Sequence, residues 1–281
     1  MEKKHNYKQI KKVSKNQLPL VIGSFDIIHQ GHWNLLKEVL NTDFNILLIV
    51  NSPKTKTYFN TTEQRINNLE ILNPKCIYVL DVYKHNYTHT QFINKVLKEI
   101  NPSVIVVGSN FRFGEDAIGT IDTLIKDFNV IVIDAKKYKT KDIKDLYLNA
   151  HVEEANKQVV LPIVYEGKVV KGKQFGRTYG FPTLNLVFND NNLIIPKNGI
   201  YASHVYIDAH VYNAATYINK SQNKTLIESY VIDKKLPFNM YGKNIKVRLL
   251  KYIKPTSKIK SGNHKQYVAS MVKLIKKYFN V

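Results

Sequence analysis

The chain has 281 residues, of which 44% are hydrophobic and 11% aromatic, and it contains a single cysteine, Cys76. This length allows two domains that each bury a core, and one cysteine excludes an internal disulfide and all multi-cysteine zinc sites. No apolar run reaches the roughly 18 residues that span a bilayer, and residues 1–15 are polar and lysine-rich, unlike a secretory signal. We therefore expect a folded cytoplasmic protein with no membrane partner.

The formal net charge of +20 allows two interpretations. One is nucleic-acid binding. The other is a lysine-rich composition spread over the whole surface, which also suits polyanionic substrates such as ATP. Because the lysines do not gather in one block, and asparagine, isoleucine and tyrosine are also plentiful, we favour the second and expect no specific nucleic-acid partner.

Five short apolar runs in the first half predict buried strands, and amphipathic segments between them predict helices. The strands are expected at residues 18–23, 45–51, 77–80, 104–108 and 130–133, and the helices over 33–40, from residue 61, over 88–100 and over 123–128. Thr61 and an acid in the first turn favour a helix start, whereas residues 1–12 fit either a frayed tail or a short helix. Uniformly apolar strands that alternate with helices predict a parallel sheet covered on both faces.

Two histidines stand at the first strand-to-helix junction, where residues 23–32 read GSFDIIHQGH. A helix N-terminus offers free N–H groups and a positive dipole end to an anion. His29 and His32 are therefore candidates for holding a nucleotide α-phosphate and for stabilising charge during phosphoryl transfer. A metal site or a pair of structural histidines is the alternative, because an isolated HxxH is weak evidence.

A second candidate ligand loop follows the fourth predicted strand, where residues 108–114 read GSNFRFG. Ligands of parallel sheets bind at the carboxyl ends of the strands, and both this loop and the histidine turn are expected there. An aromatic–arginine–aromatic trio suits a planar ring and a phosphate. A surface turn that buries two hydrophobic side chains is equally compatible.

From residue 162 the pattern changes to short β-rich runs separated by glycine, asparagine and proline. The runs lie at residues 163–165, 168–170, 183–187, 201–207, 210–217, 226–232 and 245–253. Such a series predicts a small antiparallel barrel. Residues 264–279 predict a helix docked on that barrel, because one face of the segment carries apolar side chains. These are Tyr267, Val268, Met271, Val272 and Ile275.

A glycine-rich loop stands out in the second half, where residues 169–186 read VVKGKQFGRTYGFPTLNL. A glycine at every fourth residue disfavours helix and strand alike and suits a bare backbone that lies close to a ligand. Exposed N–H groups can cradle phosphate oxygens, and an arginine can neutralise them. Thr183 and Asn185 put two oxygen ligands on one side of an extended segment, which suits magnesium. For the glycines alone, a β-turn in an all-β domain is the alternative.

Residues 172–185, GKQFGRTYGFPTLN, resemble the ATP-binding signature of riboflavin kinases. These usually form the C-terminal half of prokaryotic bifunctional riboflavin kinase/FMN adenylyltransferase, also called FAD synthetase. Residues 23–32 and 108–114 resemble the GxFDGxHxGH and GxDFRFG segments of the same enzymes, with Ile27 in place of glycine and Asn110 in place of aspartate. Residues 149–156, NAHVEEAN, resemble the family's GDVEEAN helix. The resemblance covers nearly the whole chain.

The resemblance implies two domains. Residues 1–156 would form a Rossmann-like parallel sheet of the nucleotidyltransferase type, and residues 157–281 a six-stranded Greek-key β-barrel with a terminal helix. The implied reactions are phosphorylation of riboflavin to FMN by ATP, and adenylylation of FMN to FAD with release of pyrophosphate. Magnesium is the implied metal, and the expected assembly is a monomer or a weak homo-oligomer.

The resemblance also assigns roles to residues. Glu228, within LIESYVID at residues 226–233, resembles the general base of the kinase, although an isolated glutamate on a strand would be interpreted as an exposed carboxylate. His29 and His32 would stabilise the transition state of adenylyl transfer, and Thr183 and Asn185 would ligate magnesium. The residues expected to bind ATP or flavin are Gly23, Phe25, Asp26, Gly31, Gly108, Asn110, Phe111, Arg112, Gly114, Lys144, Gly172, Gly176, Arg177, Gly180, Phe181, Pro182, Thr183 and Asn185.

Two family segments are poorly matched. Residues 51–56 contain no histidine where the family has a TFxPHP-like element, and residues 138–144, YKTKDIK, replace a serine-rich ISSTxIR element, with Lys144 in place of arginine. A riboflavin kinase with an altered adenylyltransferase domain is therefore one alternative. A basic nucleic-acid-binding protein is another, but it leaves the glycine loop and the HxGH turn unexplained.

Overall fold

The computed structural model describes residues 7–8, 17–50, 57–134, 137–171, 183–222, 224–233, 236, 240–255 and 264–280. The chain divides into two compact units. The first consists of Met1–Asp142 with Gln158–Leu161, and the second of Ile143–Lys157 with Pro162–Val281. Within the described part of the chain, no helix is long and apolar enough to cross a membrane.

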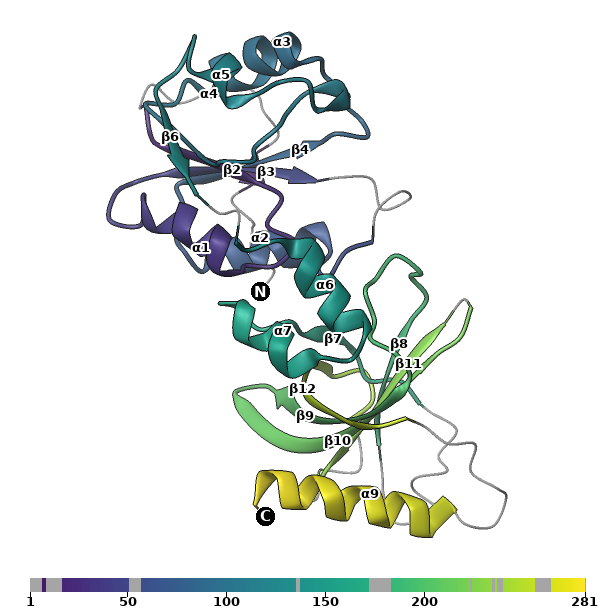
Figure 1. Ribbon diagram of the computed structural model, residues 1–281. Coiled ribbons are helices and arrows are strands. Elements are labelled where there is room, and N and C mark those ends of the chain that lie inside the picture. Colours follow the sequence, from purple (N-terminus) through teal and green to yellow (C-terminus); the bar gives the residue numbers. More distant parts are fainter. Residues whose placement is uncertain are drawn as a thin grey trace. The chain divides into compact units, whose positions relative to one another are not determined.

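The first unit is built on a sheet with the strand order β1-β4-β3-β2-β5-β6 (Figure 1). Its strands are β1 (Tyr7–Lys8), β2 (Leu20–Gly23), β3 (Asn45–Val50), β4 (Cys76–Asp81), β5 (Ile105–Gly108) and β6 (Val130–Ile133). Every neighbouring pair is parallel, so the predicted parallel sheet is confirmed. Residues 7 and 8 add a short strand at one edge. The strand order reverses between β2 and β5, which is where doubly wound sheets bind ligands.

Both faces of this sheet are buried, because its side chains alternate between two hydrophobic clusters. Leu20 and Ile22 of β2 face one cluster, and Val21 faces the other. One face is covered by α1 (Gln30–Lys37) and α2 (Thr62–Glu70) (Figure 1). The opposite face is covered by α3 (His89–Phe92), η1 (Ile93–Leu97), α4 (Lys98–Ile100) and α5 (Ile121–Leu124). Burial on two sides explains why the strands are apolar throughout.

The helix starts follow local sequence. Thr61 and Gln64 form a reciprocal capping box at the start of α2, and Thr88 and Gln91 form another at the start of α3. The predicted helix over residues 88–100 is continuous from α3 to α4, but its middle, η1, is a π-helical segment. It ends at Asn101, which adopts the left-handed conformation.

The second unit is an antiparallel sheet with the order β7-β12-β9-β10-β11-β8. Its strands are β7 (Tyr165–Lys168), β8 (Leu184–Phe188), β9 (Gly199–Ile207), β10 (His210–Lys220), β11 (Thr225–Val231) and β12 (Asn244–Lys254). Strand β12 returns beside β9 after the β9-β10-β11 meander, which is a Greek key. A bridge between Val170 and Asn185 joins the two ends of this order, so the barrel is nearly closed. The predicted six-stranded Greek-key barrel is confirmed.

Three fully buried hydroxyl groups link β9, β10 and β11. Thr216 Oγ1 lies 2.6 Å from Ser203 Oγ and 2.8 Å from Ser229 Oγ. Ser203 donates its proton to the carbonyl oxygen of Ala214 over 3.1 Å. Since each hydroxyl has one proton to donate, Thr216 donates to Ser203 and Ser229 donates to Thr216. This chain of bonds fixes β11 against β10, and with it the neighbouring Glu228.

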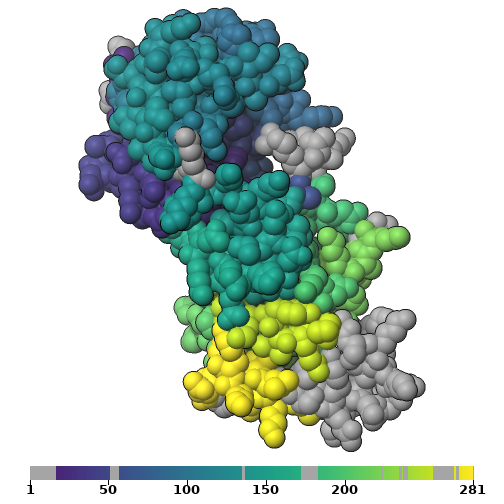
Figure 2. Space-filling view, in the orientation of Figure 1, coloured from purple at the N-terminus to yellow at the C-terminus, as the bar shows by residue number. Residues whose placement is uncertain are grey.

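Among the described residues, three helices belong wholly or mainly to the second unit: α6 (Thr140–Leu148), α7 (Val152–Gln158) and α9 (His264–Phe279). Ile275 of α9 packs with Ile200 and Ala202 of β9, so the predicted C-terminal helix docks on the barrel. Figure 2 shows this helix, in yellow, at the surface of the unit. In α7 the side chain of Asn156 donates to the carbonyl oxygen of Leu249 over 2.8 Å. The boundary after Asn156 between two functional domains stays a prediction.

Candidate active sites

The turn after β2 and the loop after β5 start from neighbouring strands of the first unit. Strand β2 pairs directly with β5, through Leu20 with Ile105 and Val21 with Val106. Both strands are parallel, so their carboxyl ends meet at one edge of the sheet. The fold therefore brings the predicted histidine turn and the 108–114 loop to the same edge, at the reversal of strand order.

The two histidine rings are nearly parallel and are held by different hydrogen bonds. His29 is the N-cap residue of α1, and its Nδ1 accepts the backbone N–H of His32 over 3.2 Å. Nδ1 of His32 lies 2.7 Å from the carbonyl oxygen of Ile27. The two rings stack with centroids 3.8 Å apart and an interplanar angle of 15°. Because a carbonyl oxygen only accepts, Nδ1 of His32 carries the proton, whereas neutral His29 carries its proton on Nε2.

Glycine and a strained backbone create the space for this turn. A Cβ atom on Gly31 would lie 3.0 Å from Cε1 of His29, so a side chain at residue 31 would press on the stacked ring. A Cβ atom on Gly23 would lie 2.8 Å from the ring of Phe25. Phe25 itself has a φ of 41°, which is uncommon for a bulky residue. These contacts explain the two glycines of the GSFDIIHQGH segment.

Burial keeps both imidazoles neutral near pH 7. It lowers the pKa of His29 from 6.5 to about 4 and the pKa of His32 from 6.5 to about 3, and the positive charge of one ring opposes that of the other. His29 can thus donate a hydrogen bond from Nε2–H without being charged. His32 needs a second proton to donate from Nε2, and a bound polyphosphate would favour that charged form.

The depressed pKa values predict an acid-sensitive first unit. Between pH 6.5 and about 4, the unfolded chain binds a proton at residue 29 that the folded chain does not bind, so the free energy of unfolding falls as pH falls. The expected loss at pH 5 is about 2 kcal/mol per histidine. Urea unfolding at pH 7 and pH 5, followed by the fluorescence of Trp33, the chain's single tryptophan, measures it.

The matched variant is the double change His29→Gln and His32→Asn. It should flatten the pH dependence, while leaving any contribution from Asp26, whose pKa burial raises. An equally steep pH dependence in the variant would show that other groups cause the loss.

The carboxylate of Asp26 faces the protein. It accepts the backbone N–H groups of Phe59 and Asn60 over 3.0–3.1 Å. It also pairs with Arg65 Nη2 at 2.9 Å. These contacts join Asp26 to other parts of the protein. The binding of a nucleotide by Asp26 stays a prediction.

The 108–114 loop is anchored by its aromatic residues. Phe113 is buried, and its ring centroid lies 5.1 Å from that of Phe92 and 5.7 Å from that of Phe111. Both loop phenylalanines pack against the core, which corresponds to the alternative of a turn that buries two hydrophobic side chains. Asn110 and Arg112 are exposed, so these two polar side chains are the accessible ones. Gly114 has a φ of 76°, and a Cβ there would lie 2.5 Å from the backbone nitrogen of His89.

In the second unit, strands β8 and β11 bring three predicted kinase residues together. Asn185 of β8 lies directly opposite Glu228 of β11, and such opposite side chains share one face of the sheet. Thr183 precedes Asn185 by two residues; its Oγ1 donates to Asn185 Oδ1 over 3.3 Å, and Asn185 Nδ2 donates to the carbonyl oxygen of Thr183 over 3.4 Å. On its other side Glu228 lies opposite Tyr217 of β10.

Of the remaining predicted residues, the structure describes Lys144 but not those of the glycine loop. Lys144 lies on α6, in the part of that helix that belongs to the second unit, and its contact with ATP stays a prediction. The part of the glycine loop that is predicted to bind phosphate lies outside the described residues, as do residues 51–56. These loop residues are Gly172, Gly176, Arg177, Gly180, Phe181 and Pro182.

Two features of the sites were missed by sequence reasoning. One is the contact of Asp26 with Arg65 and Asn60, and the other is the hydroxyl chain beside Glu228. A signal for the first exists, because Arg65 falls on the same helical face as Ile66 and Leu69, which are buried. A cation on a core-facing stripe predicts a buried anion.

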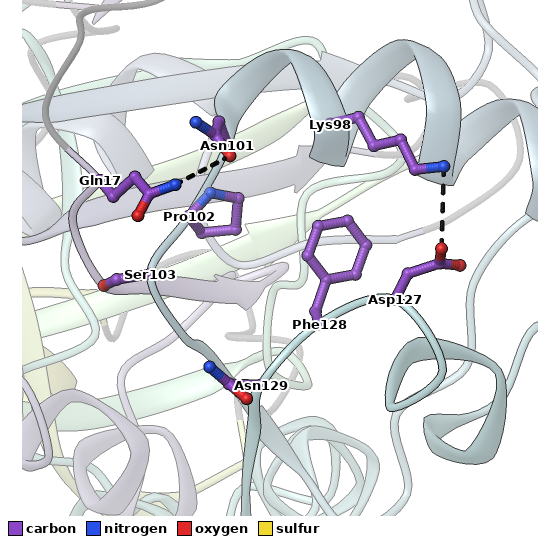
Figure 3. A pocket seen from close by; sticks show the side chains of 8 residues that line it. All are labelled: Gln17, Lys98, Asn101, Pro102, Ser103, Asp127, Phe128 and Asn129. Carbon is purple, nitrogen blue, oxygen red and sulfur yellow. Dashed lines mark hydrogen bonds and ion pairs between the residues drawn. The ribbon is translucent and has the colours of Figure 1, made fainter.

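A surface cavity of about 330 Å³ lies elsewhere in the first unit (Figure 3). It is lined by Gln17, Lys98, Asn101, Pro102, Ser103, Asp127, Phe128 and Asn129. Lys98 pairs with Asp127 at 3.7 Å, and Gln17 donates to Asn101 over 3.4 Å. Its residues 103 and 129 precede β5 and β6, so it lies at the amino ends of the strands, away from the edge where parallel sheets bind ligands.

A doubly wound sheet with an HxGH turn at its reversal point, followed by a Greek-key barrel with a glycine-rich loop, defines a two-domain nucleotide-dependent transferase. Comparison with family models agrees with this class. The model described as FAD synthetase matches residues 11–146, and the model described as riboflavin kinase matches residues 160–271. The chain belongs to the family of bifunctional riboflavin kinase/FMN adenylyltransferases, and it contains the domains of both of the family's activities.

Individual relatives support this membership. A bifunctional riboflavin kinase/FMN adenylyltransferase of Mycoplasma pneumoniae is 26% identical, covering 86% of this chain and 90% of the relative. One of Bacillus subtilis is 27% identical, covering 85% of each. The trifunctional protein RibF/MnmA of Mycoplasmoides gallisepticum is 34% identical over 91% of this chain, but the chain spans only 39% of that relative.

A solved structure has the same two-domain fold. It is the crystal structure of a protein of Streptococcus pneumoniae named as a macrolide-efflux protein. It superposes with a TM-score of 0.80 at 25% identity, covering 94% of both chains.

Proposed function

We propose that the second unit transfers the γ-phosphoryl group of ATP to the terminal ribityl hydroxyl of riboflavin, with Glu228 as the general base. The observation that carries this proposal is the register of β8 and β11, which sets Glu228 opposite Asn185. Asn185 in turn is hydrogen-bonded to Thr183. A base that accepts the hydroxyl proton next to oxygen ligands for a phosphate-bound metal is what phosphoryl transfer needs. Positioning and charge neutralisation provide most of the remaining acceleration.

Thr183 and Asn185 would hold magnesium in this reaction. Two neighbouring ligands of an octahedral magnesium ion, each about 2.1 Å from the metal, lie roughly 3 Å apart. The 3.3 Å between Thr183 Oγ1 and Asn185 Oδ1 fits that spacing. When bound, the ion would neutralise charge on the ATP phosphates. The two side chains hold each other in place through their own hydrogen bonds, so the oxygens are set before ATP arrives.

In the first unit, we propose that the phosphate of FMN attacks the α-phosphorus of ATP, giving FAD and pyrophosphate. His29, with Nε2–H available in the neutral ring, would donate to an α-phosphate oxygen. His32, held by Ile27 at Nδ1, would add a second donor once its Nε2 is protonated. Both would stabilise the charge that develops in the transition state.

The proposed activities also imply substrates, an assembly state and a cellular compartment for the enzyme. Its substrates are small molecules, ATP, riboflavin and FMN. We expect a monomer or a weak homo-oligomer that works in the cytoplasm, and gel filtration at several concentrations would test the assembly.

Product analysis tests the function directly. The purified protein is incubated with ATP and magnesium, once with riboflavin and once with FMN, and the flavins are separated by chromatography. We expect FMN and FAD from the first mixture and FAD from the second. FMN without FAD would indicate a kinase with an altered adenylyltransferase domain. No flavin product, together with steeply salt-dependent binding to DNA, would favour the nucleic-acid-binding alternative.

A further inference from the structure

A buried guanidinium lies beneath the HxGH turn. Arg65, on the first turns of α2, is 9% exposed. Its three nitrogens face three different parts of the protein: Nε donates to the carbonyl oxygen of Asn60 over 3.0 Å, Nη1 to that of Ser24 over 3.2 Å, and Nη2 pairs with Asp26 at 2.9 Å. This arginine is therefore directed at the protein and not at a nucleotide.

Asp26 connects the turn after β2 to the segment that precedes α2. Its carboxylate takes the backbone N–H groups of Phe59 and Asn60, and the side chain of Asn60 donates back to the carbonyl oxygen of Asp26. Two loops are thus tied together: the one that follows β2 and carries the histidines, and the one that leads into α2. Arg65 contacts both neighbours of Phe25 in the chain, Ser24 and Asp26. Phe25 is the residue with the φ of 41°, so Arg65 and Asp26 together form a clamp around the strained point of the turn.

The energetics favour a role beyond stability. Two charges taken out of water lose much of their hydration, and a buried ion pair is often no more stabilising than apolar residues of similar volume. The planar guanidinium of Arg65 makes three directed contacts, and it therefore fixes the positions of its partners in a way that the single ammonium group of a lysine cannot.

We propose that Arg65 and Asp26 are positioning residues, which hold the turn after β2 so that His29 and His32 present their Nε2 atoms to the nucleotide. This inference rests on the proposed function for its catalytic part. A turn held loosely would misplace both imidazoles, and a displacement of about 1 Å can reduce a rate by about 100-fold.

The test uses two readouts on the full chain with Arg65→Met, Arg65→Lys and Asp26→Asn. The first readout is the NMR titration of the histidines. Loosening the turn should expose both rings, so their pKa values should rise from about 4 and about 3 toward 6.5. The second is turnover. FAD formation from FMN should fall about 100-fold in kcat in Arg65→Met, and Arg65→Lys should not restore it. FMN formation from riboflavin should be unchanged.

A matched control breaks an exposed ion pair of the same unit. Lys75 and Asp43 lie 3.2 Å apart and are both more than half exposed, so Lys75→Met should leave the titration and both activities unchanged. Asp26→Asn keeps the shape of the side chain while removing its charge, so it tests the same contact if Arg65→Met fails to fold.

The outcomes separate the two proposals. Raised histidine pKa values in a folded variant support the clamp even if the wild-type protein forms no FAD, a result that would count only against the proposed function. Histidine titrations that stay at the wild-type values in all three variants would overturn the clamp, whatever happens to turnover.

Discussion

Replacing Glu228 by glutamine is expected to reduce FMN formation by about 10²- to 10⁴-fold, the usual contribution of a general base. Glutamine keeps the size of the side chain and an acceptor oxygen, but it cannot take the proton of the ribityl hydroxyl. The register of β8 and β11 and the hydroxyl chain through Ser229 and Thr216 keep residue 228 in place. The change should therefore lower kcat with little effect on the KM for ATP.

Chromatography of flavins in single-turnover and steady-state assays measures this effect. FAD formation from supplied FMN is the internal control, because it depends on the first unit, and it should keep its wild-type rate. Glu166→Gln is the matched variant on the same barrel: Glu166 lies on β7 and pairs with Lys246 at 3.4 Å, and it is not part of the row of Asn185, Glu228 and Tyr217 on β8, β11 and β10. Wild-type kinase turnover in Glu228→Gln would remove this glutamate from the mechanism.

Replacing His32 by alanine is expected to reduce FAD formation by about 10²- to 10³-fold, the usual cost of losing one donor that stabilises a transition state. Alanine removes both the Nε2 donor and the bond from Nδ1 to the carbonyl oxygen of Ile27. His32→Asn separates the two effects, because its amide can still donate to Ile27 but does not reach the place of Nε2. We expect both variants to lose FAD formation.

The measurement is FAD formation from FMN and ATP, with FMN formation from riboflavin as the internal control. His210→Ala provides the comparison for loss of an exposed imidazole elsewhere, since His210 begins β10 of the barrel. If His32→Asn restores FAD formation and His32→Ala does not, His32 supports the turn without touching the nucleotide. FAD formation at the wild-type rate in both variants would show that the HxGH assignment is wrong.

The two sites differ in what fixes them. In the first unit the imidazoles depend on a short turn, and burial keeps them uncharged until a polyphosphate binds. In the second unit Glu228 and Asn185 lie on the paired strands β11 and β8, and Thr183 directly precedes β8. Buried hydroxyl groups link β11 to β10 and β9.

The sequence by itself determined the class of each half. Uniformly apolar runs between amphipathic helical segments predicted a parallel sheet buried on both faces. The short β-rich runs after residue 162 predicted an antiparallel barrel. Capping residues such as Thr61 and Thr88 set the helix starts, because a cap acts within three residues of itself. The resemblance of the motifs at residues 23–32, 108–114 and 172–185 to those of a known family pointed to that family.

Only the tertiary structure decided which residues meet. No local pattern states that Glu228 lies opposite Asn185, because the register between β8 and β11 is set by a barrel that closes over long sequence separations. The contact of Asp26 with Arg65 likewise joins residues on different elements, and it places Asp26 in a buried network that no local pattern indicates. Local propensity acts over a few residues, whereas charges and hydroxyl groups find their partners only when the core is packed.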